Sequence, residues 1–523
     1  MDILEKIHFY ASACPGRTAV RTGREELTYS QLWEYSGKLA QWLEKEFPKM
    51  DASVPLPVYG HKSPWMLVCF LACVRSGHSY CPIDISVPSA RIRGILQALP
   101  EGPVLTTCPF PVMDTGRPVA DPEVIREVCR DPADNKSGEC RAVRGDDVFY
   151  IIFTSGSTGT PKGVMITADC LNHYLDWSVC LAGISPEISE DEGAVFLNQA
   201  PFSFDLSVMD LYTCLACGGT LVCLTKEVQG DYRSLMKTLQ ESAARVWVST
   251  PSFADVCLAD PSFGRELMPR LEVFLFCGET LANKTAGKLL DRFPQARMIN
   301  TYGPTESTVC VTGTEITKAL ASGPDPLPVG RAKPGTVIEI RSEDGGLLPE
   351  GEKGEIVILG DTVSPGYYGQ KELTQKAFFT SGDVRGYRTG DAGYLSGGML
   401  FFCGRIDLQI KLHGYRIELE DIEANLCRLP QTEKAAVIPN ERGGKVTSLT
   451  AYIVPSGGIP ADKTARKEFQ DRIRKELLTF LPEYMIPKKI VLTGQIPMTA
   501  NGKADRKRLA AEAANGQTGD RKP

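Results

Sequence analysis

The stretch Tyr150-Ile-Ile-Phe-Thr-Ser-Gly-Ser-Thr-Gly-Thr-Pro-Lys-Gly-Val164 starts as an apolar strand and breaks into a loop of glycine and hydroxyl residues. Glycines let the backbone bring N–H groups close to an anion, and the hydroxyl groups and Lys162 add donors and a positive charge. The Walker phosphate loop requires Gly-Lys followed by Ser or Thr, whereas Lys162 lies between Pro161 and Gly163. Because a second β-branched run follows at 164–167, the pattern predicts a phosphate-binding turn between two strands rather than a flexible hairpin. The predicted phosphate-binding residues are Thr154, Ser155, Gly156, Ser157, Thr158, Gly159 and Lys162.

The size and composition of the chain are those of a multidomain globular protein. With 523 residues it exceeds one ordinary hydrophobic core, and 42% hydrophobic and 23% charged residues are typical of soluble proteins. No apolar run approaches the ~18–20 residues that span a membrane, and residues 1–10 lack a signal-peptide pattern. The net charge of −6 argues against nucleic acid as the main partner. We therefore expect a cytoplasmic protein that neither inserts into a membrane nor binds nucleic acid.

The cysteine and histidine content bears on disulfides and metal sites. Seventeen cysteines are scattered through strand-like runs without a CxxC repeat, and five histidines are spread along the chain. Small buried cysteines in a reducing cytoplasm explain this distribution better than a disulfide framework. A zinc site has little support.

Strands and helices alternate between residues 193 and 306. The expected strands are 194–199, 220–224, 245–249, 272–276 and 297–300, with helices between them. This rhythm predicts a mostly parallel sheet covered by helices, and ligands of such sheets gather beyond the carboxyl ends of the strands. We expect four loops to converge there on one site, and they carry Asp205, Thr250-Pro251, Cys277-Gly278-Glu279 and Tyr302-Gly-Pro-Thr-Glu306.

The pattern of elements changes twice toward the C-terminus. From about residue 323, short strands separated by Gly, Pro and Asp predict a small β-rich subdomain. Past Arg405-Ile-Asp407 the chain has the composition of a compact α/β unit of about one hundred residues. The predicted fold is thus α/β, with a large N-terminal domain (1–406) of helix-covered, mostly parallel sheets and a β-rich subdomain. A small α+β C-terminal domain (407–515) and a disordered tail (516–523) follow.

Three further segments carry polar groups that could serve chemistry. In Tyr387-Arg-Thr-Gly-Asp391 an acid follows a turn and could accept hydrogen bonds from vicinal sugar hydroxyls. The segment 402–418 places Arg405, Lys411 and Arg416 in an alternating apolar pattern, and 497–503 ends in an Asn-Gly turn with Lys503 at its tip. Taken singly, each is typical of a solvated surface turn or an amphipathic strand.

Six motifs in order along the chain resemble those of the adenylate-forming superfamily, the AMP-binding enzymes. This superfamily includes acyl-CoA synthetases, luciferases and the adenylation domains of nonribosomal peptide synthetases. The resemblance covers about residues 10–510. The motifs are Tyr80-Cys-Pro-Ile-Asp84, the loop 154–163, Asn300-Thr-Tyr-Gly-Pro-Thr-Glu306, Tyr387-Arg-Thr-Gly-Asp391, Gly404-Arg-Ile-Asp-Leu-Gln-Ile-Lys411 and Asn501-Gly-Lys503.

The resemblance implies a ligase reaction in two halves. A carboxylate attacks the α-phosphorus of ATP to give an acyl adenylate and pyrophosphate, and a phosphopantetheine thiol on a carrier protein then takes the acyl group. The family implies that Lys503 bridges the substrate carboxylate and ATP, that Asp391 and Arg405 bind the ribose, and that Glu306 helps to hold Mg²⁺. The implied catalytic residues are Lys503, Arg405 and Lys411. The implied nucleotide-binding residues beyond the phosphate loop are Asn300, Thr301, Tyr302 (stacked on adenine), Gly303, Pro304, Thr305, Asp391, Phe402, Cys403, Gly404, Arg405 and Lys503.

Within the superfamily, three segments resemble the ligases that activate D-alanine for the esterification of teichoic acids. They are 202–212 with Asp205, 276–279 with Cys277, and 411–418, where His413 stands at the position that is usually arginine in peptide-synthetase domains. An amino acid brings an ammonium group that must be paired when it leaves water, and Asp205 supplies a carboxylate. The resemblance implies a substrate pocket of Asp205, Cys277, the backbone near Val309, and Lys503. Phe402 departs from the tyrosine that the family often has.

The resemblance also implies motion and a partner. Asp407 occupies the family's hinge position, and rotation there would exchange Lys503 for the loop 411–414 in one active site. No carrier-like segment follows residue 510, so we expect a separate, acidic D-alanyl carrier protein and a monomeric ligase. Basic residues that could meet the carrier are Arg466, Lys467, Arg472, Arg474 and Lys475, although a solvated helix face explains them equally well.

Three alternatives to this hypothesis stay open at the level of sequence. The nearest is a freestanding adenylation enzyme of the peptide-synthetase type for another small amino acid. A coenzyme A ligase for a small carboxylic acid would leave Asp205 unpaired. A catalytically inactive binding protein would have no chemical need to retain Lys162, Asp391, Arg405 and Lys503 together.

Overall fold

The computed structural model divides the chain into two compact units. It describes residues 1–23, 25–131, 141–156, 161–184, 193–324, 326–406, 408–442, 445–498 and 504–514. The first unit comprises Met1–Ile85, Ala98–Phe153 and Gly163–Ile406, and the second comprises Ser86–Gln97, Thr154–Lys162 and Asp407–Pro523. The predicted phosphate loop and a short helical segment therefore group with the C-terminal part of the chain.

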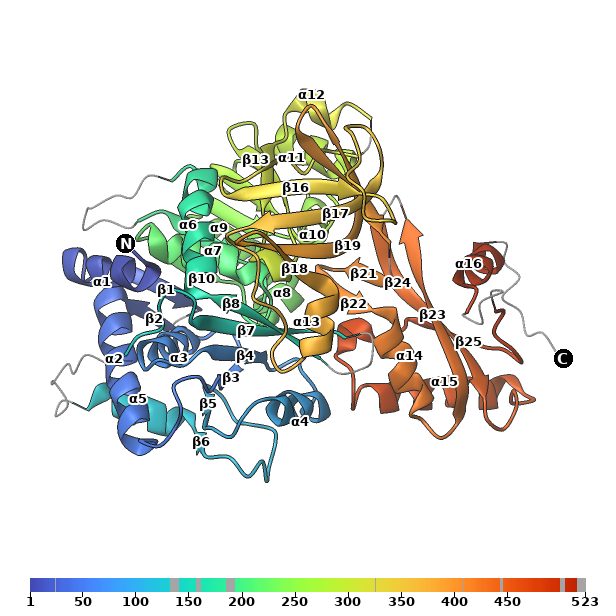
Figure 1. Ribbon diagram of the computed structural model, residues 1–523, viewed down its shortest axis with the longest axis horizontal. Coiled ribbons are helices and arrows are strands. Elements are labelled where there is room, and N and C mark those ends of the chain that lie inside the picture. The colour runs from blue at the N-terminus through green and yellow to red at the C-terminus, as the bar shows by residue number, and fades with distance from the viewer. Residues whose placement is uncertain are drawn as a thin grey trace. The chain divides into compact units, whose positions relative to one another are not determined.

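A nine-stranded sheet runs through the first unit (Figure 1). Neighbouring strands are parallel in the central part of the sheet, which has the order β1, β10, β9, β11, β12 and β13. The edge strands β2, β14 and β15 pair antiparallel. This confirms the predicted mostly parallel sheet. In pairing order, the strands are β15 (Arg331–Ala332), β14 (Thr312–Glu315), β13 (Arg297–Tyr302), β12 (Val273–Phe276), β11 (Val246–Ser249), β9 (Val195–Asn198), β10 (Thr220–Cys223), β1 (Thr18–Thr22) and β2 (Glu25–Thr28).

Both faces of this sheet are buried, because successive side chains of a strand enter two different cores. In β9, Phe196 lies in one core together with α7 (Leu206–Ala216), and Leu197 lies in the other with α10 (Pro251–Leu258) and α11 (Asn283–Arg292). Strands buried on both faces have continuous apolar sequences, which explains why they were predictable. Further helices of this unit are α1 (Ile3–Ala13), α2 (Tyr29–Glu46), α3 (Pro64–Arg75), α5 (Pro122–Arg130), α6 (Ala168–Ala182), α8 (Lys226–Gly230), α9 (Tyr232–Glu241), α12 (Lys318–Ala321), α13 (Lys371–Ala377) and the 3-10 turn η1 (Thr305–Ser307).

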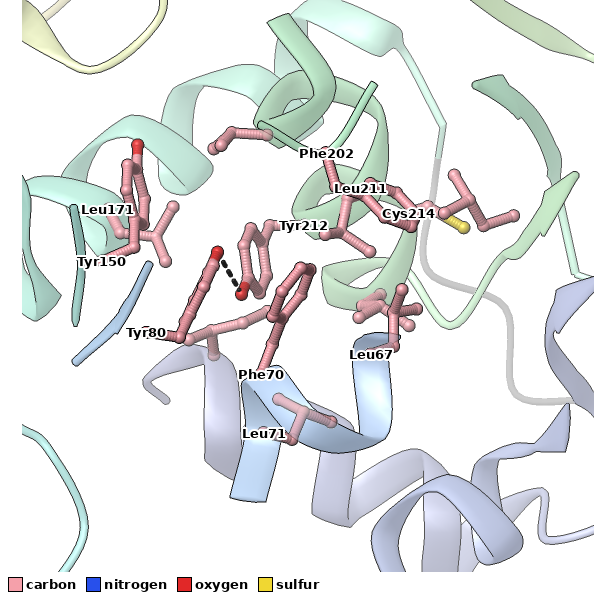
Figure 2. Close-up of a cluster of buried hydrophobic side chains, with 14 of the residues drawn as sticks. Leu67, Phe70, Leu71, Tyr80, Tyr150, Leu171, Phe202, Leu211, Tyr212 and Cys214 are labelled. Atoms are coloured by element: carbon pink, nitrogen blue, oxygen red, sulfur yellow. Dashed lines mark hydrogen bonds between the residues drawn. The ribbon is translucent and has the colours of Figure 1, made fainter. Parts of the chain in front are cut away.

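A six-stranded sheet holds the two strands that flank the phosphate loop. In pairing order it contains β6 (Val119–Ala120), β5 (Val104–Thr106), β3 (Leu56–Gly60), β4 (Tyr80–Asp84), β7 (Val148–Thr154) and β8 (Lys162–Thr167). Because β7 and β8 are neighbours, the structure confirms a loop between two paired strands. Aromatic side chains of β4, β7 and α7 meet in the core between the elements, where the Tyr212 hydroxyl donates to the Tyr80 hydroxyl over 2.9 Å (Figure 2).

The predicted β-rich subdomain is an antiparallel five-stranded sheet in the first unit. It comprises β16 (Thr336–Arg341), β17 (Gly354–Gly360), β18 (Phe378–Ser381), β19 (Val384–Ser396) and β20 (Met399–Arg405). Tyr302 of β13 packs into the core of this sheet with Tyr387, so the two sheets share a boundary where a motif residue lies.

The second unit has a hairpin and a three-stranded sheet with helices. The hairpin is β21 (Gln409–Leu412) and β22 (Tyr415–Glu418), and the sheet is β23 (Thr432–Arg442), β24 (Lys445–Pro455) and β25 (Lys489–Leu492). The helices are α4 (Ser89–Ala98), whose last residue belongs to the first unit, α14 (Leu419–Cys427), α15 (Lys463–Leu477), η2 (Glu483–Met485) and α16 (Arg506–Ala514). The alternation of sheet and helix confirms the predicted α+β character of this region.

Two general expectations can be compared with the described parts of the chain. The cysteines resolved there are free thiols and most are buried, as expected for small core residues. In the same ranges, no helix is both long and apolar enough to cross a membrane.

A buried lysine joins the two large sheets of the first unit. Lys62 follows β3 and is 1% exposed. Its Nζ donates to the carbonyl oxygens of Gln199 (2.5 Å) and Leu224 (2.7 Å), which follow β9 and β10. Burial lowers the pKa of Lys62 to about 8, against the partial opposition of Cys223 and Asp210. The charge is thus retained at a cost in stability.

We expect this cost to disappear at alkaline pH. Between a folded pKa of about 8 and the ordinary 10.5 of an unfolded lysine, the unfolded chain binds more protons, so stability rises with pH. Below pH 8 both states are charged and the full cost of burial remains. Between pH 7.5 and 9.5, the free energy of unfolding of the wild type should rise by about 2 kcal/mol relative to that of Lys62→Met. Chemical denaturation of both proteins at the two pH values measures this difference, and parallel profiles would contradict a depressed lysine pKa.

Candidate active site

A buried carboxylate, Asp391, is one of the residues predicted to bind the nucleotide. Asp391 on β19 is 2% exposed and lies opposite Arg405 of β20 in the sheet register. Its Oδ1 accepts from Arg405 Nη1 over 2.7 Å, and its Oδ2 accepts from the Tyr302 hydroxyl over 2.5 Å. Arg405 Nη1 also donates to the Thr389 carbonyl oxygen over 2.9 Å. Because an ionised carboxylate has about four acceptor positions, Asp391 retains capacity for two further donors such as vicinal hydroxyls.

The tyrosine that contacts Asp391 stays protonated. Burial raises the pKa of Tyr302 well above its ordinary value, and the neighbouring charge of Asp391 raises it further. The hydroxyl therefore donates to the carboxylate across the physiological range. Its ring lies 5.7 Å from the Phe402 ring at an angle of 34°. Phe402 and Cys403 are half-buried, and Gly404 has a φ of 97°, which favours glycine.

The motif after β13 is held by backbone and side-chain contacts. Asn300 Nδ2 donates to the Pro328 carbonyl oxygen over 2.9 Å, and the Thr301 hydroxyl donates to the Phe276 carbonyl oxygen over 2.8 Å. A Cβ atom on Gly303 would lie 2.3 Å from the Cα of Cys310, so only glycine fits there. Pro304 and Thr305 then lead into η1. This segment is rigidly attached to the strand before it.

Glu306 is a fully buried carboxylate with a partner that the sequence did not indicate. Its Oε1 accepts a hydrogen bond of 2.8 Å from the Tyr367 hydroxyl. Mg²⁺ binds proteins through one or two carboxylates and leaves its other positions to water and substrate phosphates. Glu306 fits that pattern. Among residues with described positions, no three His, Cys, Asp or Glu side chains form a fuller metal-binding group.

Two consecutive β-branched residues next to Glu306 have left-handed backbones. Thr308 has a φ of 59° and Val309 a φ of 67°. Such conformations cost on the order of 1–3 kcal/mol each and occur mainly where the surrounding structure imposes them. The Thr308 hydroxyl donates to the Thr362 carbonyl oxygen over 2.8 Å, and the Cys310 amide donates to the Thr308 carbonyl oxygen over 2.8 Å. These bonds hold the turn that orients the Val309 carbonyl.

The predicted substrate residues Cys277 and Val309 lie in contact. The Cys277 thiol donates to the Val309 carbonyl oxygen with a sulfur-to-oxygen distance of 3.8 Å. Behind them, the thiol of Cys310 lies 3.9 Å from the hydroxyl oxygen of Tyr174, and all four residues are buried. The loops after β12 and β13 therefore converge as predicted, while Tyr174 and Cys310 were not anticipated.

Asp205 lies at the start of α7, and its neighbours Phe204 and Leu206 pack in the same core as Cys277 and Val309. Its side chain accepts no hydrogen bond from the first turn of α7, although aspartate commonly caps helices in that position. It is half-buried, and its charge raises the pKa of the buried Tyr150. A further contact links the loops at this edge, since the Ser252 amide donates to Glu279 Oε2 over 3.0 Å.

The described part of the phosphate loop contacts the β21–β22 hairpin within the second unit. Lys162 Nζ lies 3.0 Å from Glu418 Oε1, and both side chains are buried. The Ser155 hydroxyl donates to the Arg416 carbonyl oxygen over 2.9 Å and accepts from the Glu418 amide over 3.2 Å. Thr154 and Gly156 are described as well, whereas Ser157, Thr158 and Gly159 lie outside the described residues.

We expect Glu418 to compete with phosphate for Lys162. In Glu418→Gln the ammonium loses its buried carboxylate partner, so an ATP phosphate meets no competing charge. We expect the binding free energy of ATP to become more favourable by about 1 kcal/mol, which corresponds to a roughly fivefold lower dissociation constant. Equilibrium dialysis with labelled ATP measures it, and Glu420→Gln, which changes an acid two residues further along the chain, is the control. Weaker ATP binding in Glu418→Gln would show that the pair supports the loop instead.

The remaining predicted residues divide between described and undescribed positions. Lys411 is half-buried on β21 and lies opposite Arg416 in the hairpin register. His413 and Gly414 form the turn, with φ values of 54° and 83°, as a two-residue hairpin of type I′ requires. Lys503 and Asp407 lie outside the described residues.

The chain matches known families over most of its length. Residues 8–368 match the AMP-binding enzyme family, and residues 421–503 match the AMP-binding enzyme C-terminal domain. A solved NRPS protein containing adenylation and PCP domains has a TM-score of 0.78 at 27% identity, covering 98% of this chain and 84% of that one. The Vibrio cholerae adenylation domain AlmE, in complex with glycyl-adenosine-5'-phosphate, has a TM-score of 0.78 at 22% identity, covering 98% of both chains. The chain therefore belongs to the AMP-binding enzymes and has the fold of their adenylation domains.

Curated relatives indicate a particular group within this family. The D-alanine--D-alanyl carrier protein ligase of Bacillus licheniformis is 48% identical over 98% of this chain and 99% of its own length. The protein of the same name from Bacillus cereus is 45% identical over 98% and 99%. Within the AMP-binding enzymes, the chain belongs with the D-alanine--D-alanyl carrier protein ligases. The comparisons thus confirm the superfamily that the six motifs indicated and the group of D-alanine ligases that the three further segments resembled.

Proposed function

We propose that the protein activates D-alanine with ATP and transfers the D-alanyl group to the phosphopantetheine thiol of a separate carrier protein. The observation that carries the proposal is the buried contact of the Cys277 thiol with the Val309 carbonyl, in the core where the residues that flank Asp205 also pack. Family membership with the D-alanine--D-alanyl carrier protein ligases supports the same substrate. The D-alanyl group on the carrier protein would then be used to esterify teichoic acid.

The nucleotide half of the site has the donors and acceptors that adenylation requires. Asp391, held by Arg405 and Tyr302, would accept the ribose hydroxyls, and Tyr302 and Phe402 would present ring surfaces to the adenine. Charge develops on the α-phosphate and the departing pyrophosphate, so fixed cations are the main catalytic need. We assign that task to Lys162 and Lys503. When bound at Glu306, Mg²⁺ would neutralise phosphate charge.

The amino-acid half would recognise an ammonium group and a methyl side chain. Asp205 would pair with the ammonium, which cannot enter a buried site without a partner. Cys277 would limit the space available to the side chain, so larger amino acids are excluded by steric clash. A single methylene is worth only ~1–3 kcal/mol, so discrimination against glycine should be moderate.

The second half-reaction requires the carrier and a change of arrangement. We propose rotation about Asp407, which would remove Lys503 and bring Lys411 and the His413 turn to the site. The carrier would be acidic and would meet basic side chains of α15. Candidate contacts on α15 are Arg466, Lys467, Arg472, Arg474 and Lys475. We further propose that the enzyme acts as a monomer in the cytoplasm, where ATP is available.

A second candidate is a freestanding adenylation enzyme for another small amino acid. Asp205 would serve any amino acid equally well, and the weak discrimination by size leaves glycine, L-alanine and D-serine as competitors. The choice between the two functions therefore depends on the measured preference among these four substrates.

Amino-acid-dependent exchange of pyrophosphate into ATP tests the proposal. D-alanine, L-alanine, glycine and D-serine are compared, with Lys503→Ala as the inactive control. Strong exchange with D-alanine that is lost in the control supports the ligase. Preference for another amino acid would leave the adenylation chemistry intact and reject D-alanine, while no exchange with any of them would reject amino-acid activation.

A further inference from the structure

A buried hydroxyl group near Asp205 lacks a hydrogen-bond partner. Tyr150 on β7 is 0% exposed, and its Oη contacts no donor or acceptor among the described residues. Figure 2 shows this hydroxyl pointing away from the hydrogen bond that joins Tyr80 and Tyr212. Buried polar groups are nearly always paired, so an unpaired one indicates a missing water or ligand.

The surroundings of Tyr150 belong to the amino-acid pocket. Burial raises the pKa of Tyr150 well above its ordinary value, and the charge of Asp205 raises it further, so the phenol stays neutral. Tyr150, Tyr174 and the thiols of Cys277 and Cys310 are buried in one core. Phe204 and Leu206, which precede and follow Asp205 in the chain, pack in the same core. Tyr150 therefore shares one core with the residues that flank Asp205 and with the two thiols.

A neutral phenol suits the group that Asp205 is expected to bind. An ammonium group has three N–H donors, and each needs an acceptor when water is excluded. One carboxylate on one side cannot satisfy all three. A phenol oxygen accepts from the ammonium while its own proton can be donated to the carboxylate, which also fixes the orientation of Asp205.

We propose that Tyr150 is a further substrate-binding residue, whose hydroxyl completes the ammonium site formed by Asp205. This rests on the proposed function, since it requires an amino acid as substrate. The backbone strain at Thr308 and Val309 on the neighbouring loop agrees with a pocket whose shape is imposed.

If Tyr150 had only a structural role, removing its hydroxyl would change the stability of the fold and not the binding of substrate. Tyr212 belongs to the same aromatic cluster, and its hydroxyl is fully paired with Tyr80. Removing that paired hydroxyl leaves Tyr80 without its donor and destabilises the fold. Removing the unpaired hydroxyl of Tyr150 costs the free protein nothing and can even stabilise it. Tyr212→Phe is therefore a matched control for Tyr150→Phe.

The experiment measures pyrophosphate exchange and thermal unfolding in the full-length protein. KM values for D-alanine and for ATP, and the Tm without ligand, are determined for the wild type, Tyr150→Phe and Tyr212→Phe. We expect Tyr150→Phe to raise the KM for D-alanine about tenfold, leave the KM for ATP within twofold, and keep or raise the Tm. Tyr212→Phe should lower the Tm and leave the KM for D-alanine within twofold.

Two results would overturn the inference. An unchanged KM for D-alanine in Tyr150→Phe would show that the hydroxyl does not contact the substrate, and equal rises for D-alanine and ATP with a lower Tm would indicate a structural role. Propionate, which lacks the ammonium group, separates this failure from that of the proposed function. If the wild type exchanges pyrophosphate as fast with propionate as with D-alanine, the proposal that it recognises an amino acid is wrong. If the wild type and Tyr150→Phe both prefer D-alanine to propionate to the same extent, only the role of Tyr150 is rejected.

Discussion

Asp205→Asn should reduce kcat/KM for D-alanine by roughly 10²- to 10³-fold. The substrate ammonium would enter a buried pocket without a carboxylate, and breaking a buried ion pair by removing one partner costs about 3–5 kcal/mol. Because Asp205 is half-buried, we expect the lower part of this cost, about 3–4 kcal/mol, which at 1.4 kcal/mol per factor of ten gives the stated range. Pyrophosphate exchange over a range of D-alanine concentrations measures it.

The control for this variant removes a carboxylate of similar size outside the pocket. Asp255 on α10 is exposed and accepts from the Thr285 hydroxyl over 2.7 Å, so Asp255→Asn should retain activity. ATP binding by Asp205→Asn, measured by equilibrium dialysis, should equal that of the wild type. If kcat/KM fell less than fivefold in Asp205→Asn, the ammonium must be bound elsewhere.

Asp391→Asn should raise the KM for ATP by about 10- to 100-fold. Hydrogen bonds to charged groups contribute about 1.5–3 kcal/mol each, and asparagine presents one acceptor oxygen where aspartate presents two. Arg405, which is half-buried, would also lose its carboxylate partner at 2.7 Å and keep only its bond to the Thr389 carbonyl oxygen. The KM for D-alanine should change little, because Asp391 is proposed to contact the ribose and not the amino acid. ATP titrations at saturating D-alanine measure the effect.

A charge-matched control for this variant lies in the same unit. Asp361 pairs with Lys333 over 2.5 Å, and Asp361→Asn should affect stability more than the KM for ATP. Tyr302→Phe, which removes only the hydroxyl donor to Asp391, should give a smaller rise in KM than Asp391→Asn. Equal KM values for ATP in Asp391→Asn and the wild type would remove Asp391 from the nucleotide site.

Elements buried on both faces were the most predictable part of the fold. The helix expected between the strands 194–199 and 220–224 is α7 (Leu206–Ala216), and the strand expected at 245–249 is β11 (Val246–Ser249). Continuous apolar runs bounded by Gly-Gly or polar residues define such elements from local sequence alone. The site loops could be predicted with them, because parallel strands place their carboxyl ends at one edge.

Contacts between distant side chains were not predictable. Lys162 and Glu418 are 256 positions apart, and neither residue carries a pattern that indicates the other. The contacts of Tyr367 with Glu306 and of Tyr174 with Cys310 were missed for the same reason, since these partners are 61 and 136 positions apart in the chain. The unpaired hydroxyl of Tyr150 became visible only when burial and hydrogen bonds could be examined together.

The left-handed turn at Thr308 and Val309 limits how substrate preference can be redesigned. The Val309 carbonyl that meets Cys277 is oriented by main-chain torsions, so exchanging the Val309 side chain changes volume without moving that oxygen. Glycine at these two positions would relieve the unfavourable torsions and release the carbonyl from its fixed direction. Substitutions at Cys277 should therefore change which substrate side chains fit the pocket. Substitutions at 308–309 should instead lower the selectivity among substrates.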